Sequence, residues 1–190
     1  MTVLGDEDWS FYIVVTFINN MFRDFNQSSL QSNSLPSHKK PCLVRFYVKK
    51  PCLVSWSKPP PQVWCINVDD SSLGNPGSAG FGGLICSEDG SWIRGFSGFI
   101  GFTTNLHAKL LAILHGLRLA RNLQLQRVLC QTNSLEAIHL ISSGNRKFHR
   151  YACFIYNICA FLEDWDVTLA HTLREGDQCA DWLAKFGTSN

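Results

Sequence analysis

The stretch NVDDSSLGNPG at residues 67–77, followed by AGFGGLI at residues 79–85, decides the fold of this chain. Just before and within it, Trp64, Ile66 and Val68 alternate with more polar residues, and this period of two is typical of a strand. Residues 74–77 form a Gly-Asn-Pro-Gly turn cluster, and a glycine-rich apolar run follows. The stretch therefore predicts two neighbouring strands joined by a turn, with Asp69 near the end of the first.

The residues that follow alternate between strand and helix patterns. Asp89-Gly90 predicts a hairpin into a third strand over 92–99. Thr104 can cap a helix that runs to about residue 121, with an apolar stripe at Leu106, Leu110, Ile113, Leu114 and Leu117. We then expect a strand over 127–131, helices over 134–142 and 151–162, a strand over 165–171 and a helix over 178–185. The order βββαβααβα predicts an α/β (α+β) fold in which helices flank a mixed five-stranded sheet.

Composition divides the chain into three parts. Residues 1–30 can form a single N-terminal helix, residues 31–62 read as a Ser/Pro/Lys-rich basic linker, and residues 63–190 form the domain. The linker repeats KKPCLV at 39–44 and 49–54 and holds six basic and no acidic residues between Lys39 and Lys58. This segment either attracts a polyanion non-specifically or is a solvated linker.

The overall composition excludes several classes of protein. With 45% hydrophobic residues and a net charge of +2, the chain can bury a core and is not globally disordered. Its eight cysteines show no metal-binding spacing, and free core thiols at Cys65, Cys130 and Cys159 indicate a reducing compartment. The acidic start is unlike a secretory leader, and the apolar run 9–22 is too short to span a membrane. We therefore expect an intracellular monomer, nuclear or cytoplasmic, with no membrane partner.

Three ordered motifs are specific to one family. The opening stretch is the first, NLHA at residues 105–108 is the second, and LREG at 173–176 with CADWLA at 179–184 is the third. With this order and spacing, the chain from about Trp56 to Lys185 resembles the type 1 ribonuclease H domain in its plant retrotransposon-derived, reverse transcriptase-like form. The resemblance implies a ribonuclease H-like fold and an endonuclease that hydrolyses the RNA strand of an RNA–DNA hybrid.

The resemblance also implies a metal centre. In this family two Mg²⁺ ions activate water and stabilise the leaving oxygen, and four acids supply the hard oxygen ligands that Mg²⁺ prefers. Carried over to this chain, Asp69 and Asp181 are retained as catalytic, metal-binding acids, whereas Lys109 and Asn133 stand at the other two positions. His171 matches the family's proton-shuttling histidine, but alternation places it with Val167 and Leu169, so a structural role stays open.

These replacements change the expected chemistry. Glu to Lys and Asp to Asn together make the site about three unit charges more positive, and each charge at close range is worth several kcal/mol. The Lys109 ammonium is expected to lie where a metal would, paired with Asp69 or Asp181, and to weaken Mg²⁺ binding by orders of magnitude. Compensation is not expected, because alternation points Asp70 to the other strand face and Glu136 fits a solvated helix residue. Asp177 fits a cap of the last helix.

The resemblance implies a nucleic-acid-binding surface as well. Its candidate residues are Asn75, Arg146, Lys147, Arg150 and Arg174, which can contact a hybrid backbone by shape rather than sequence. A solvated basic loop is the alternative for residues 146–150. Trp92, Trp165 and Trp182 are expected to anchor the core rather than to stack on bases.

Three hypotheses about function remain open at this point. The first is an RNA–DNA hybrid endonuclease by family, with weak or lost activity because its active site is degenerate. The second is a nucleic-acid-binding module that keeps the fold and hybrid affinity without the chemistry. The third is a decayed retroelement fragment.

Overall fold

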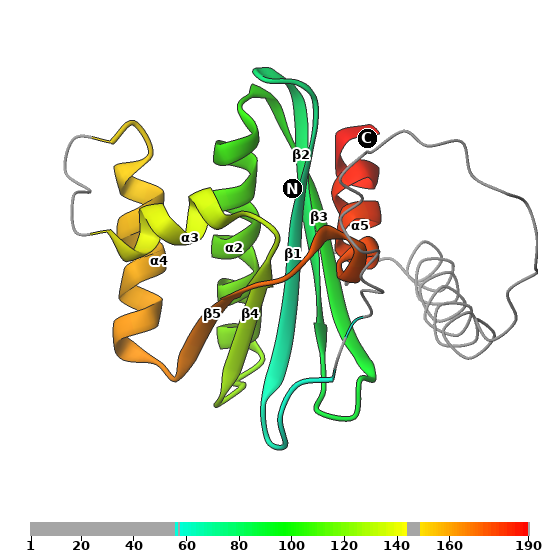
Figure 1. Ribbon diagram of the computed structural model, residues 1–190, viewed down its shortest axis with the longest axis vertical. Helices are drawn as coiled ribbons and strands as arrows, with labels where there is room; N and C mark the ends of the chain where they lie inside the picture. Colours follow the sequence, from blue (N-terminus) through cyan, green and yellow to red (C-terminus); the bar gives the residue numbers. More distant parts are fainter. Residues whose placement is uncertain (1–55, 57, 144–148, 190) are drawn as a thin grey trace, which may run out of the picture.

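A computed structural model describes residues 56, 58–143 and 149–189 (Figure 1). The expected N-terminal helix, the tandem repeat, Cys42, Cys52, Arg146 and Lys147 lie outside these described residues. The elements follow the predicted order, with a short 3₁₀ helix, η1, added before the last helix. They are β1 (Trp64–Gly74), β2 (Gly77–Cys86), β3 (Trp92–Thr103), α2 (Asn105–Asn122), β4 (Val128–Thr132), α3 (Leu135–Ser142), α4 (Ala152–Asp164), β5 (Val167–His171), η1 (Arg174–Gly176) and α5 (Gln178–Ser189).

The five strands form one mixed sheet, as expected, and their order in the sheet is β3-β2-β1-β4-β5. β1 pairs antiparallel with β2 and parallel with β4, and β5 lies parallel to β4 at the edge. The pairing with β4 ends where Val68 meets Thr132, whereas β1 itself continues to Gly74. The flank of β1 that begins at Asp69 is therefore free of β4, and the candidate site lies there.

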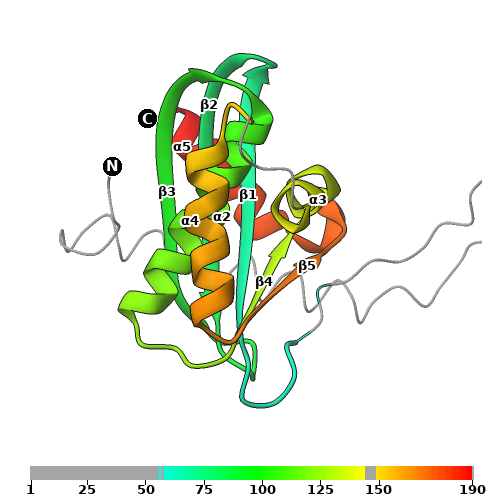
Figure 2. The same cartoon turned by 90° about the vertical axis from the view of Figure 1, so that its left-hand side faces the viewer.

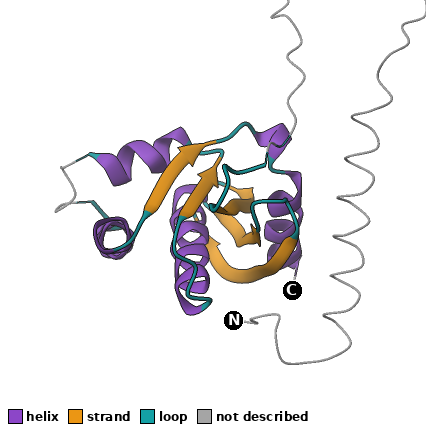
Figure 3. Cartoon of the chain, turned by 90° about the horizontal axis from the view of Figure 1, so that it is seen from below, coloured by secondary structure: helices purple, strands orange, loops and turns teal. Residues whose placement is uncertain are grey.

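Helices cover both faces of the sheet. α2, α3 and α4 lie on one side and α5 lies on the other (Figures 1 and 2). Figure 3 shows the same layers from below, with helices on either side of the strands. The larger core lies between the sheet and α2, where Ile66 and Val68 of β1 meet the buried stripe of the helix. A smaller core under α5 is formed by Leu84, Cys86, Ala180 and Leu183.

The three tryptophans are core residues, as predicted. Trp92 and Trp182 pack against the smaller core, as does Trp56 just before the first strand. Trp165 packs against the larger core and donates its indole N–H to the Leu125 carbonyl oxygen at 2.9 Å. A hydrogen bond inside an apolar contact is the usual arrangement of a buried indole.

Two glycines let the helices approach the strands closely. A Cβ atom built on Gly116 of α2 would lie 2.9 Å from a methyl carbon of Ile66. A Cβ atom built on Gly82 of β2 would lie 2.4 Å from the backbone nitrogen of Ala184. Since α5 rests directly on the strand at Gly82, its first turn, which carries Asp181, is brought beside the end of β1.

The predicted helix starts are confirmed by their caps. The Thr104 hydroxyl accepts from the backbone N–H of His107 at 3.3 Å, and the Ser134 hydroxyl accepts from that of Ala137 at 3.1 Å. α5 runs past the expected end at Lys185 to Ser189, and the Thr188 hydroxyl in its last turn donates to the Ala184 carbonyl oxygen at 3.0 Å. Local polar groups thus fix where α2 and α3 begin.

The cysteines of the described part are all free, in agreement with the sequence prediction. Cys65, Cys130 and Cys159 are buried, and burial raises the pKa of the Cys130 thiol to about 12. They therefore pack as small apolar side chains rather than as reactive thiolates. Within the same residues, no helix combines the length and hydropathy that crossing a membrane would require.

Candidate active site

A cleft of about 750 Å³ opens where β1 extends beyond β4. Its walls come from the end of β1, the start of α2, the end of β4, the segment after β5 and the first turns of α5. Most of the sequence-predicted site residues meet here: the lining includes Asp69, Asn133, His171, Arg174 and Asp181. The resemblance thus selected residues that the fold brings together from five separate segments.

The floor of this cleft is a buried cluster around the ammonium of Lys109. The side chain projects from α2, the residue is 3% exposed, and its Nζ atom pairs with the Asp69 carboxylate. The same nitrogen lies 2.7 Å from Asp70 Oδ1 and donates to Asn133 Oδ1 at 2.7 Å. The Asn133 side-chain amide in turn donates to Asp69 Oδ2 at 3.1 Å. The predicted pairing of Lys109 with Asp69 is confirmed, and both substituted positions belong to one hydrogen-bonded group.

Asp70 belongs to this cluster, which corrects the expectation that it would point away from the site. Alternation places it on the same face of β1 as Ile66 and Val68, and that face is covered by α2. Lys109 approaches from the same helix. The alternation argument was therefore sound, but its conclusion was wrong, because the site opens on the α2 face of the strand as well.

The charges of the cluster hold the lysine protonated. Burial alone would lower the pKa of Lys109, but the charges of Asp70 and Asp69 and their hydrogen bonds outweigh it and raise the pKa above its ordinary value. Burial raises the pKa of the Asp70 carboxyl, against the lowering effect of Lys109, and Asp69 adds to the rise. A cation enclosed by carboxylate and amide oxygens is the stable arrangement of this buried site.

Of the two partners expected for Lys109, Asp69 or Asp181, the structure shows Asp69, and Asp181 has other partners. Lys109 pairs with Asp69 and Asp70, whereas the Asp181 carboxylate accepts from Arg174 at 3.2 Å and from the ammonium of Lys185. Arg174 lies near the site, as predicted from the third motif. Sequence reasoning missed Lys185, although a lysine four residues after an aspartate on a helix is a standard ion-pair spacing.

His171 ends β5 and faces the cleft. Its side chain is exposed, while Val167 and Leu169 earlier on the strand are half-buried. The alternative of a structural histidine on the packed face is therefore wrong. The alternation of exposed and half-buried residues along β5 stops at Ala170, which is half-buried like Leu169, one residue before the strand ends.

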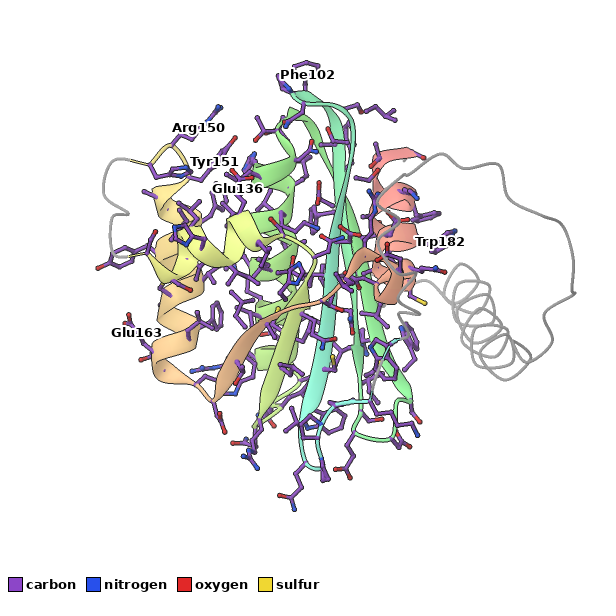
Figure 4. All side chains as sticks on the ribbon, in the orientation of Figure 1. Phe102, Glu136, Arg150, Tyr151, Glu163 and Trp182 are labelled. Atoms are coloured by element: carbon purple, nitrogen blue, oxygen red, sulfur yellow. The ribbon has the colours of Figure 1, made fainter. Side chains whose placement is uncertain are left out.

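Asn75 and Arg150, two further candidate binding residues that the structure describes, lie near the start of α2. Asn75, in the turn after β1, accepts from the backbone N–H of Asn105 at 3.2 Å, and Asn105 lines the cleft. Figure 4 shows Arg150 and Tyr151 at the start of α4. The Arg150 guanidinium lies 4.8 Å from the centre of the Tyr151 ring, and the Tyr151 hydroxyl is 2.6 Å from that of Thr104, the cap of α2. Thr104 and Asn105, at the start of α2, thus connect the cleft to Tyr151 and Arg150.

Two further acids complete the set considered from sequence. Glu136 is exposed on α3 (Figure 4), as expected. Asp177 does not cap α5, because among the described residues neither of its side-chain oxygens has a hydrogen-bond partner and only its backbone oxygen accepts, from Asp181. Burial raises the pKa of Asp177 well above its ordinary value, Asp69 adds to the rise, and Lys109 and the nearby Asn67 amide oppose it.

The residues present do not fit a divalent metal ion at the Lys109 position. Mg²⁺ requires oxygen ligands with uncompensated negative charge. Both oxygens of Asp69 already accept hydrogen bonds, and an ammonium occupies the space between Asp69 and Asn133. Among the residues that the structure describes, no three His, Cys, Asp or Glu side chains are grouped so that they could hold a metal.

Comparison with known proteins defines the class of this domain. Residues 67–187 match the reverse transcriptase-like family, and the chain belongs to that family, with a domain of the ribonuclease H type. A curated Arabidopsis thaliana protein that is named as a ribonuclease H protein is 33% identical over 141 residues, which is 73% of this chain. The chain spans only 21% of the length of that relative.

Solved structures show the same fold. Ribonuclease H1 of the halophilic archaeon Halobacterium salinarum is 22% identical, with a TM-score of 0.61 over 67% of this chain and 98% of its own. LC11-RNase H1, solved in complex with an RNA/DNA hybrid, is 25% identical, with a TM-score of 0.61 over 66% of this chain and 96% of its own. The α/β fold expected from the sequence is therefore confirmed as ribonuclease H-like.

Proposed function

We propose that residues 63–190 bind RNA–DNA hybrids in the cleft and that hydrolysis of the RNA strand is strongly reduced or lost. Membership of the family and the likeness to a ribonuclease H1 solved with a hybrid support the binding. The observation that carries the loss of activity is the Lys109 ammonium enclosed by Asp69, Asp70 and Asn133.

The loss follows from the charge requirements of two-metal hydrolysis. Such a site needs several carboxylates arranged around the metals. Here Lys109 replaces one carboxylate and neutralises a second, Asp69, and Asn133 supplies an amide where an acid is required. A cation entering beside Lys109 would meet repulsion of roughly 4 kcal/mol per pair of unit charges at 4 Å and an effective dielectric of 20.

The retained groups are consistent with a binding role. Asp69 and Asp181 are the surviving members of the carboxylate set, and His171 keeps the place of the proton shuttle. Arg174 lies at the cleft and Arg150 near its rim, where a nucleic-acid backbone would pass. Asn75 extends the same proposed surface, and the sequence-predicted residues Arg146 and Lys147 lie outside the described residues.

A cleavage assay tests the proposal. A labelled RNA–DNA hybrid is incubated with Mg²⁺ or Mn²⁺ and the native chain, or with the Lys109→Glu/Asn133→Asp double variant. We expect no metal-dependent cleavage by the native chain and a gain by the double variant. Arg127→Glu is the control, because it adds negative charge at the opposite end of β4 from Asn133. Robust metal-dependent cleavage by the native chain would contradict the proposal.

A further inference from the structure

Cations and anions are arranged in two layers in the cleft. The side chains of Asp69, Asp70 and Asp181 are 3%, 14% and 16% exposed. The side chains of Arg174 and Lys185, which hold Asp181, are 71% and 59% exposed. The carboxylates thus lie inside and these two cations lie outside, toward the open cleft.

The positive and negative charges of the ion pairs in the site also sum to zero without any metal ion. Lys109, Arg174 and Lys185 supply three positive charges against the three carboxylates that they contact. In a site built only of acids, a phosphate backbone would be repelled until metal ions entered. Here Lys109 is shared by Asp69 and Asp70, and Arg174 and Lys185 both contact Asp181, so the three positive and three negative charges sum to zero at distances well inside the screening length of about 10 Å.

We propose that this cleft binds the sugar–phosphate backbone of an RNA–DNA hybrid without any divalent metal ion. Arg174 and Lys185 contact the phosphates, and Lys109 acts as the internal counter-ion that reduces the repulsion from Asp69 and Asp70. The inference rests on the proposed hybrid binding and adds its mode: the protein's own cations replace the metal as the charge partner of the nucleic acid.

Arg174 and Lys185 have more hydrogen-bond donors than their contacts with Asp181 require. A guanidinium has five N–H donors and an ammonium has three. Arg174 uses one nitrogen on Asp181 Oδ1, and Lys185 contacts Asp181 Oδ2. Both can therefore keep Asp181 neutralised while they donate to a phosphate. Lys109 is too deeply buried to do so, and its effect on binding is electrostatic.

Glu175 is the exposed acid that also lines the cleft. It lies beside Arg174 in η1, and His171 faces the same space. Glu175 opposes an approaching phosphate without belonging to the buried cluster. The Glu175→Gln change is therefore expected to tighten binding of the hybrid and to leave its independence of metal unchanged.

The direct test measures hybrid affinity by fluorescence anisotropy with the full chain, in EDTA and in Mg²⁺ at matched ionic strength. We expect equal affinities within about twofold, because the three carboxylates of the buried cluster and of Asp181 are already paired with the protein's own cations. Native binding that is about tenfold or more weaker in EDTA, a 1.4 kcal/mol difference, would overturn the inference. The Lys109→Glu variant should bind weakly in EDTA and recover with Mg²⁺.

A second measurement does not depend on how Lys109→Glu folds. Arg174→Ala and Lys185→Ala should each lower the slope of log affinity against log salt by about 0.9, the value for one phosphate contact. Arg127→Ala, an exposed arginine paired with Asp166 away from the cleft, should leave the slope unchanged. Unchanged slopes for both cleft variants would overturn the inference.

The outcomes separate this inference from the proposed function. Binding that requires Mg²⁺ would contradict the inference alone, because the hybrid would still be the ligand. No binding of the hybrid at low salt, with or without Mg²⁺, would contradict both.

Discussion

The Lys109 ammonium lies 2.7 Å from Asp70 Oδ1, on the face of β1 that α2 covers. It also pairs with Asp69, the preceding residue, and donates to Asn133 just beyond β4. One buried cation therefore ties α2 to β1 and to the end of β4, which gives it a structural role as well as an electrostatic one.

Removing this cation is expected to destabilise the fold. Lys109→Met keeps the length of the side chain but leaves the buried Asp69 and the half-buried Asp70 without their counter-ion, and breaking a buried ion pair in this way costs about 3–5 kcal/mol. The free energy of unfolding is measured by urea denaturation. Lys185→Met is the matched control, since an exposed lysine in an ion pair contributes about 1 kcal/mol or less. Equal losses for the two variants would show that Lys109 is not a buried counter-ion.

Asp177 predicts a dependence of stability on pH. Because burial raises the pKa of its carboxyl, the folded chain holds the proton more tightly than the unfolded chain. Its contribution to stability is complete below the ordinary carboxyl pKa of about 4 and is lost as pH rises toward the folded pKa. Asp177→Asn, which stays neutral, should gain stability over the native chain as pH rises from 4 to 8.

Melting temperatures of the two chains across this pH range measure the difference. Asp166→Asn, at an exposed site, is the control and should show only a small difference from the native chain. If the native chain and Asp177→Asn melted in parallel at every pH, the pKa of the carboxyl would be the same in the folded and the unfolded chain.

Sequence patterns within a few residues predicted the strands and helices of the domain well. The cap at Thr104 and the apolar stripe of α2 depend on neighbouring residues, and both are as expected. The positions of Asp69, Asp181 and Lys109 came from the ordered motifs, and the structure brings the three into one region. Such features are encoded within a few residues of sequence or within a family pattern.

Features that depend on distant packing were missed. Alternation gave the correct face for Asp70, but sequence alone does not show that α2 delivers a lysine to that face. The burial of Asp177 likewise depends on Asn67 of β1 and on its place before α5, which lie far apart in the chain. Lys185 was within reach of sequence reasoning through its spacing from Asp181.

The contact of α5 with the sheet is expected to tolerate no side chain at Gly82. In Gly82→Ala the new Cβ atom would meet the backbone of Ala184 and Leu183, so the helix must shift, at a cost of about 1–3 kcal/mol or more. The shift also moves Asp181. Urea denaturation measures the loss of stability.

Gly101→Ala is the matched control for this change. Gly101 has a φ of +87° and no heavy atom within 4 Å of a built Cβ, so only backbone strain of about 1–2 kcal/mol opposes alanine there. A larger loss in Gly101→Ala than in Gly82→Ala would contradict the close approach of α5.

The proposal that Lys109 takes the place of a metal ion is tested most directly by metal binding itself. Mn²⁺ is titrated into the native chain and into the Lys109→Glu/Asn133→Asp variant, and free Mn²⁺ is followed by electron paramagnetic resonance. The native chain should leave Mn²⁺ free at millimolar concentration, whereas the double variant should bind it. Binding of Mn²⁺ by the native chain as tightly as by the double variant would contradict the account.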